Sequence, residues 1–284
     1  MAADAAKNGS NLRQRVLAAV VFVPAVLLLV EATDWTLYVL VLVVVARCSW
    51  EFYQILEQGG YRPLRLPGSI LAMGLCSYFW RLGKGELLGI DLVAQLMVVA
   101  LLLLVWTLRY AGTKRYAANA FLTLGGVLYF GLLGSAPLLL VQTAGQGEEA
   151  RHLVAVLFAC IWLTDSGAYF SGRQWGATKL APVISPNKTR VGFIGGLLGS
   201  LIPLGLGFLL PSFSPWALMG LLLVVGIGGQ LGDLVESALK RDVGVKDAPA
   251  LIPGHGGLLD RFDSYFFAFP LAYLYVDMLA IFAQ

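Results

Sequence analysis

Charged residues are scarce in this 284-residue chain: they make up 13% of it, whereas hydrophobic residues make up 58%. A soluble globular domain carries about 25% charged residues, so a water-facing surface of ordinary composition is excluded. Lipid is the alternative solvent. The 33 glycines agree with it, because transmembrane helices approach one another through small side chains. The composition therefore predicts an integral membrane protein.

Histidine and cysteine are also rare, with two and three residues. Cys48, Cys76 and Cys160 are far apart in apolar segments, without the spacing of a metal or redox motif. This argues against zinc, which needs clustered cysteine or histidine ligands. A nucleophile elbow is missing too. No predicted strand precedes the glycines at 192–199, so they favour close helix packing over a Rossmann nucleotide site.

Long apolar runs dominate the chain. A helix needs about 20 mostly apolar residues to cross the hydrocarbon core, and we expect nine such spans, at 14–32, 35–56, 66–82, 91–109, 117–142, 152–172, 192–210, 215–233 and 264–283. Pro211 and Pro215 divide the uncharged stretch 191–232 into two, because proline ends a helix. Arg47 and Glu51 interrupt the second span at a spacing that allows an ion pair. The predicted fold is all-α, a bundle of about nine transmembrane helices.

Lysine and arginine are unevenly distributed over the expected loops. With the N-terminus inside, sixteen of the 20 basic residues lie on the inner side, three lie on the outer side and Arg47 lies within a span. Since cytoplasmic loops carry excess positive charge, we expect a cytoplasmic N-terminus and cytoplasmic loops 173–190 and 234–263. The apolar run 16–30 resembles a signal peptide, but further spans follow at once, so we expect a retained first helix.

Residues 1–150 form an N-terminal group of spans whose charges lie at span ends, as topology signals do. Residues 151–284 carry the candidate chemistry. Asp165 interrupts a span, and an acidic residue at membrane depth usually faces a polar cavity, although a bond to a neighbouring helix would also explain it. The polar turn at 185–189 offers donors and positive charge to phosphate oxygens, although an ordinary cytoplasmic turn has the same composition.

The densest polar group follows the eighth span: Asp233, Glu236, Ser237, Lys240 and Arg241. Their spacing places them on one face of a helix. An ion-paired surface helix shares this spacing, but it would not normally continue such a long apolar stretch. Further polar residues precede the last span: Lys246, Asp247, His255, Asp260, Arg261 and Asp263.

Carboxylates beside phosphate-binding cations are what metal-assisted phosphoryl or nucleotidyl transfer requires. Carboxylates hold Mg²⁺ through a few oxygens while substrate phosphates complete its shell, and lysine and arginine neutralise the remaining charge. Two metal ions about 3.5–4 Å apart could stabilise both the attacking and the leaving oxygens. The pattern therefore predicts Mg²⁺ as cofactor, as one ion or two.

Two gapped patterns carry a family resemblance. S-x-x-K-R-x4-K-D from Ser237 and P-x-H-G-G-x-x-D-R-x-D from Pro253 resemble the signature of phosphatidate cytidylyltransferases, also called CDP-diacylglycerol synthases. The motifs D-S-G-A-Y at 165–169 and S-P-N-K-T at 185–189 also resemble motifs of this family, in its order. The resemblance covers about residues 162–263. This chain departs from the family at Val191, where Glu is usual, and at Pro249, where a small residue is usual.

The resemblance implies that the protein transfers a cytidylyl group from CTP to phosphatidate, giving CDP-diacylglycerol and pyrophosphate, with Mg²⁺ required. The implied metal ligands are Asp233 and Asp260, with Asp165, Glu236 and Asp263 as further ligands. The cations that would hold CTP phosphates or the lipid headgroup are Lys188, Lys240, Arg241, Lys246 and Arg261. The side chains that would orient oxygens are Ser185, Asn187, Ser237 and His255.

Other functions remain as alternatives. A CTP-dependent lipid kinase would move the γ-phosphate instead of the cytidylyl group, and an ion or solute transporter would spread its charges through the spans. A scaffold would leave the clustered carboxylates unexplained. We expect CTP, phosphatidate and membrane lipid as partners and no nucleic acid, and a homodimer is compatible with the sequence. Short loops and the lack of an N-terminal extension favour a bacterial plasma (inner) membrane, with the site at its cytoplasmic face.

Overall fold

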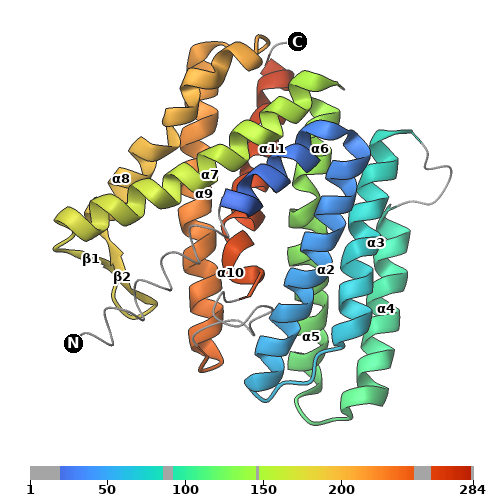
Figure 1. Cartoon of the computed structure of the whole chain (residues 1–284). Coiled ribbons are helices and arrows are strands. Elements are labelled where there is room, and N and C mark those ends of the chain that lie inside the picture. The colour runs from blue at the N-terminus through green and yellow to red at the C-terminus, as the bar shows by residue number, and fades with distance from the viewer. Residues whose placement is uncertain (1–19, 86–91, 145–146, 246–256, 283–284) are drawn as a thin grey trace.

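The computed structural model describes residues 20–85, 92–144, 147–245 and 257–282 (Figure 1). An apolar helix, Val20–Ala32, comes first. The elements that follow are α2 (Asp34–Gln58), α3 (Arg65–Gly83), α4 (Leu92–Ala111), α5 (Tyr116–Gly126), α6 (Ala136–Thr143), α7 (Glu148–Trp175), β1 (Lys179–Ala181), β2 (Ser185–Thr189), α8 (Arg190–Ser200), α9 (Pro215–Asp242), α10 (Leu259–Phe262) and α11 (Tyr265–Phe282). A π-helical segment, Val127–Leu132, and 3₁₀ turns join α5 to α6 and extend α8. The predicted all-α class is confirmed.

Seven of the described helical segments are long and apolar enough to cross a membrane: Asp34–Gln58, Leu92–Tyr110, Tyr116–Thr143, Glu148–Trp175, Arg190–Leu209, Pro215–Asp242 and Leu259–Ile281. Two of the nine expected spans do not meet this standard. The described part of the first, Val20–Ala32, is shorter than a full crossing. The third, α3, has 19 residues but includes two arginines and a proline, which lower its hydropathy. The chain is therefore a polytopic membrane protein.

Local sequence sets the boundaries of these helices. Thr33 caps α2, since its hydroxyl accepts a hydrogen bond from the Thr36 N–H at 3.1 Å. The proline-rich break ends the 3₁₀ turn after α8 at Leu209, and α9 begins at Pro215. Ser214 caps α9 through a 3.2 Å bond from the Ala217 N–H. The expected division of the long apolar stretch into two segments is confirmed.

Small residues let α7 and α8 pack in close contact. A Cβ added to Gly167 of α7 would lie 2.5 Å from the carbonyl oxygen of Gly195 on α8. Gly199 of α8 packs equally closely against Leu163 of α7: a Cβ added to Gly199 would lie 3.1 Å from the Leu163 carbonyl carbon. The glycines at 192–199 therefore serve helix packing, as the sequence predicts.

Two expected loops are partly regular structure. Residues 185–189, predicted as a turn, form strand β2, which pairs antiparallel with β1. The expected connection 234–263 is helical at both of its described ends: α9 continues to Asp242, as the helical spacing of Asp233 to Arg241 predicts, and α10 spans Leu259–Phe262. Residues 234–242 contain no proline or glycine that would end the helix, and their polar side chains are spaced along one helical face.

Helices α2, α3, α4 and α5 lie side by side, while α7 crosses α9 obliquely and carries the β1–β2 hairpin beyond its C-terminal end (Figure 1). The main core contains aromatic rings of α11 packed against other helices. The ring centroids of Phe266 and Phe130 lie 4.9 Å apart, and those of Phe269 and Phe158 lie 5.0 Å apart. This packing fixes the start of α11, and with it α10, against α7 and the α5–α6 segment. Strand β2, the start of α8 and the part of α9 around Gln230 and Asp233 come together at the C-terminal end of α7.

Candidate active site

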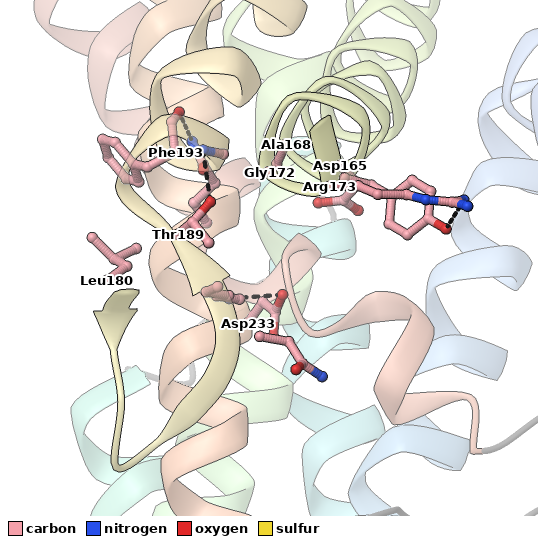
Figure 2. A pocket seen from close by; sticks show the side chains of 13 residues that line it. Asp165, Ala168, Gly172, Arg173, Leu180, Thr189, Phe193 and Asp233 are labelled. Carbon is pink, nitrogen blue, oxygen red and sulfur yellow. Dashed lines mark hydrogen bonds and ion pairs between the residues drawn. The ribbon is translucent and has the colours of Figure 1, made fainter. Parts of the chain in front are cut away.

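A cavity of about 540 Å³ opens at that end, between α7, β2, α8 and α9. Figure 2 shows Asp165 of α7 and Asp233 of α9 on facing sides of it. The lining residues are Asp165, Ala168, Tyr169, Gly172, Arg173, Leu180, Asn187, Lys188, Thr189, Gly192, Phe193, Gln230 and Asp233. Four of the sequence-predicted site residues (Asp165, Asn187, Lys188 and Asp233) therefore share one space.

The α7 wall carries an acidic and a basic side chain. Asp165, Tyr169 and Arg173 follow one another at i, i+4 and i+8, which places them on one face of the helix. Arg173 Nη1 donates to the Tyr169 hydroxyl at 3.2 Å (Figure 2). Asp165 is exposed. Sequence reasoning gave Tyr169, which ends the D-S-G-A-Y motif, no role in the site and missed Arg173, although helical spacing from Asp165 would have found both.

Opposite α7, strand β2 places a lysine on the carboxylate of α9. Lys188 Nζ lies 2.8 Å from Asp233 Oδ2, and both side chains are partly exposed (Figure 2). Ser237, one turn further along α9, lies 3.4 Å from the other carboxylate oxygen. The next residue of β2, Thr189, caps α8 by accepting a bond from the Gly192 N–H at 3.0 Å. The strand therefore passes directly into a capped helix, which fixes the position of Lys188.

A second, buried charge cluster lies further along α9. Lys240 Nζ is 2.5 Å from Glu236 Oε2 and 2.6 Å from Asp260 Oδ1. Glu236 is 2% exposed and Lys240 8% exposed, so this ammonium group is occupied by two carboxylates. Asp260 also accepts a bond from the Gly257 N–H at 3.2 Å. Lys240 therefore ties α9 to the short helix α10.

Asp263 connects the two groups. Its carboxylate lies near enough to those of Asp165, Asp233 and Glu236 to interact with them electrostatically. The backbone at this point presses on α9, since a Cβ added to Gly232 would lie 2.7 Å from the Asp263 carbonyl oxygen. Of the five predicted metal ligands, Asp165 and Asp233 thus line the cavity, while Glu236, Asp260 and Asp263 lie further along α9, on α10 and at the α10–α11 junction.

The remaining predicted residues are placed differently. Arg241 Nε donates to the Ile184 carbonyl at 3.3 Å and Nη1 to the Val245 carbonyl at 3.2 Å, so its guanidinium holds the hairpin onto α9. Ser185 is half-buried in β2 at the pair with Ala181, and Arg261 is exposed on α10. Two predicted residues, Lys246 and His255, lie outside the described residues, as does Pro249.

The described residues contain no group of three or more His, Cys, Asp or Glu side chains arranged to hold a metal ion by themselves. The donor set nevertheless fits Mg²⁺, because this ion binds through one or two carboxylates and takes its other ligands from water and substrate phosphates. Asp165 and Asp233 supply such oxygens to the cavity, and Lys188 and Arg173 supply positive charge for phosphates. The cavity can therefore hold a cation that is completed by a phosphate-bearing substrate.

The comparison with known proteins agrees with this chemistry. A model of the cytidylyltransferase family matches residues 13–279. A phosphatidate cytidylyltransferase of Staphylococcus aureus (strain COL) is 38% identical over 220 residues, which cover 77% of this chain and 82% of the relative. One of Staphylococcus haemolyticus (strain JCSC1435) is 35% identical over 258 residues, covering 90% of this chain and 94% of the relative. The family match includes every residue that lines the cavity. This chain belongs to the cytidylyltransferase family.

Proposed function

We propose that the protein transfers the cytidylyl group of CTP to phosphatidate, giving CDP-diacylglycerol and pyrophosphate. The observation that carries the proposal is the cavity in which Asp165 and Asp233 face each other beside Lys188. It joins carboxylates and a cation at the end of a helical bundle, where a lipid phosphate and a water-soluble nucleotide can meet. The names of the relatives supply the two substrates.

In this proposal the triphosphate of CTP occupies the cavity. Lys188 and Arg173 hold its oxygens from two sides, and Asn187 donates a further hydrogen bond. Asp233 and Asp165 would hold Mg²⁺, with Asp260, Glu236 and Asp263 as further ligands or as supports for them. Bound there, Mg²⁺ would neutralise charge on the phosphates and orient them. Lys188 then exchanges its contact with Asp233 for one with the nucleotide.

The chemical step needs positioning more than proton transfer. An oxygen of the lipid phosphate, already anionic near neutral pH, attacks the α-phosphorus of CTP. The bond from that phosphorus to the β-phosphate oxygen breaks, and pyrophosphate leaves with the electron pair. The protein contributes alignment of the two phosphates and neutralisation of charge. Lys240, enclosed by Glu236 and Asp260, keeps the α10 carboxylate directed towards the site.

The arrangement also supports a direction in the membrane. The hairpin borders the cavity and is bonded to the basic end of α9 through Arg241 and the Ile184 carbonyl, and basic residues mark the cytoplasmic side. This supports a site that faces the cytoplasm of a bacterial inner membrane, with the N-terminus on the same side. CTP enters from the cytoplasm, and phosphatidate enters sideways from the lipid.

The test uses purified protein, vesicles containing phosphatidate, and CTP labelled either in the cytosine ring or in the γ-phosphate. Cytosine label should enter the lipid fraction with Mg²⁺ present and should stay in solution with a chelator. Transfer of γ-label to lipid would instead identify a kinase, and solute flux without any lipid product would identify a transporter. Asp233→Asn and Asp260→Asn should nearly abolish transfer. Glu57→Gln, a change on α2 at an ion pair with Arg65, serves as the control.

A further inference from the structure

A carboxylate from the N-terminal half of the chain reaches the turn that carries Asp260. Glu51 of α2 is completely buried. Its Oε2 accepts a hydrogen bond from the Leu259 N–H at 2.7 Å, across 208 positions of sequence, and its Oε1 lies 2.8 Å from Arg47 Nε. The predicted ion pair between Arg47 and Glu51 within α2 is present, but Glu51 also bonds to the first residue of α10.

We propose that Glu51 is a positioning residue for the active site, which it serves by fixing α10 and with it Asp260. This inference rests on the proposed function, because it takes Asp260 as part of the site. It also revises the expectation that charges in residues 1–150 serve only as topology signals.

Helix α10 cannot position itself. It has four residues, and its N-cap residue, Leu258, makes no side-chain capping bond. The first N–H groups of a helix have no partner inside the helix, and a buried donor left without one is unfavourable. Glu51 supplies the missing acceptor from another helix. A carboxylate makes the stronger kind of hydrogen bond, because the acceptor is charged.

The geometry of Asp260 depends on this turn. Both of its oxygens are bound, one by Lys240 Nζ and the other by the Gly257 N–H two residues before Leu259. Displacement of residues 257–260 would therefore move the carboxylate relative to α9. Arg47 completes the arrangement, because its pairing with Oε1 leaves Oε2 directed at Leu259.

Three substitutions separate this role from a general structural one. Glu51→Met removes the acceptor with little change in volume. Glu51→Asp keeps the charge beside Arg47 but withdraws the oxygen by about one bond length, ~1.5 Å, and it serves if the methionine variant does not fold. Glu51→Gln keeps an oxygen that can accept the Leu259 N–H. Glu57→Gln is the matched control: Glu57 lies on the same helix, and its ion-pair partner Arg65 belongs to α3 and not to α10.

The first measurement is amide hydrogen exchange of the peptide that spans Leu259–Phe262, in purified protein without substrate. Glu51→Met or Glu51→Asp should raise its exchange at least about tenfold, while α11 beyond it stays protected. Glu51→Gln and the control should remain close to the unchanged protein. Unaltered exchange in the first two variants would overturn the contact itself.

The second measurement is turnover and its Mg²⁺ requirement. Glu51→Met or Glu51→Asp should lower kcat at least about tenfold and raise the half-saturating Mg²⁺ concentration, with little change in KM for CTP, and Glu51→Gln should restore most of the activity. Faster exchange with unchanged kcat and Mg²⁺ requirement would overturn the positioning role. If the unchanged protein formed no cytidylyl lipid at all, the proposed function would fail, while the exchange result would still decide whether Glu51 holds α10.

Discussion

Replacement of Lys240 by methionine should damage both stability and activity, because it removes a buried cation that lies between the carboxylates of Glu236 and Asp260. Lys240 Nζ lies 2.5 Å from Glu236 and 2.6 Å from Asp260, and the side chains of the lysine and Glu236 are 11% and 3% exposed. Breaking a buried pair by removing one partner costs about 3–5 kcal/mol. For a chain of this size that corresponds to a fall in Tm of about 6–20 °C.

The assay is thermal unfolding in detergent, measured beside cytidylyl transfer. Lys188→Met is the comparison, since its pair with Asp233 is partly exposed (23% and 34%) and exposed pairs contribute about 0–1 kcal/mol. It should abolish activity while lowering Tm by only a few degrees. The double change Lys240→Met with Glu236→Gln restores the original charge balance, so it should regain much of the Tm but not the activity. A Tm within about 2 °C of the unchanged protein for Lys240→Met would refute the buried cluster.

Three further predictions concern the cavity and its supports. Arg173→Met should lower kcat/KM for CTP about 10–100-fold with little loss of Tm, because a charge-assisted bond to phosphate is worth about 1.5–3 kcal/mol; an unchanged KM for CTP and an unchanged kcat/KM would remove Arg173 from the nucleotide site. Gly232→Ala should lower Tm and turnover, since its Cβ would lie 2.7 Å from the Asp263 carbonyl oxygen, whereas Gly229→Ala on the same helix meets nothing nearer than 3.5 Å and should be tolerated. Thr189→Ala should cost about 1 kcal/mol by removing the α8 cap, with a smaller fall in activity than Lys188→Met; equal falls would mean that β2 acts as one unit.

The sequence alone was sufficient for the membrane class, most helix boundaries and the glycine packing of α7 against α8. These features depend on composition and on short-range signals, such as the proline-rich break before Pro215 and the cap at Ser214. The patterns at 165–169 and 185–189 and those that start at Ser237 and Pro253 also indicated the family, which the comparison confirms.

What the sequence did not reveal are contacts between distant segments. The hydrogen bond from Leu259 to Glu51 crosses 208 positions, and no local pattern at Glu51 points to it. Arg241 was expected to hold phosphate because it stands in the family pattern, but its guanidinium reaches the carbonyl of Ile184. Helical spacing predicts which residues share a face, but not which neighbouring element that face contacts.

The predicted turn at residues 185–189 shows the same limit. This segment was expected to form a turn because it is short and its residues are polar. It instead pairs with Lys179–Ala181 as a strand. Hydrogen bonding to a partner strand decided their conformation, and the partner lies outside the motif. Lys188 consequently sits on a strand that is fixed at its end by Thr189, which gives the site a more rigid cation than a free turn would provide.

The central claim is that carboxylates of separate helices hold a divalent cation together with the phosphates of CTP. Its most direct test is the binding of Mn²⁺, as a spectroscopic substitute for Mg²⁺, to purified protein with CTP and without phosphatidate, measured by electron paramagnetic resonance. Asp233→Asn should weaken Mn²⁺ binding at least about tenfold, equivalent to about 1.4 kcal/mol, while Glu57→Gln leaves it unchanged. Equal Mn²⁺ affinity in the unchanged protein and in Asp233→Asn would contradict the account.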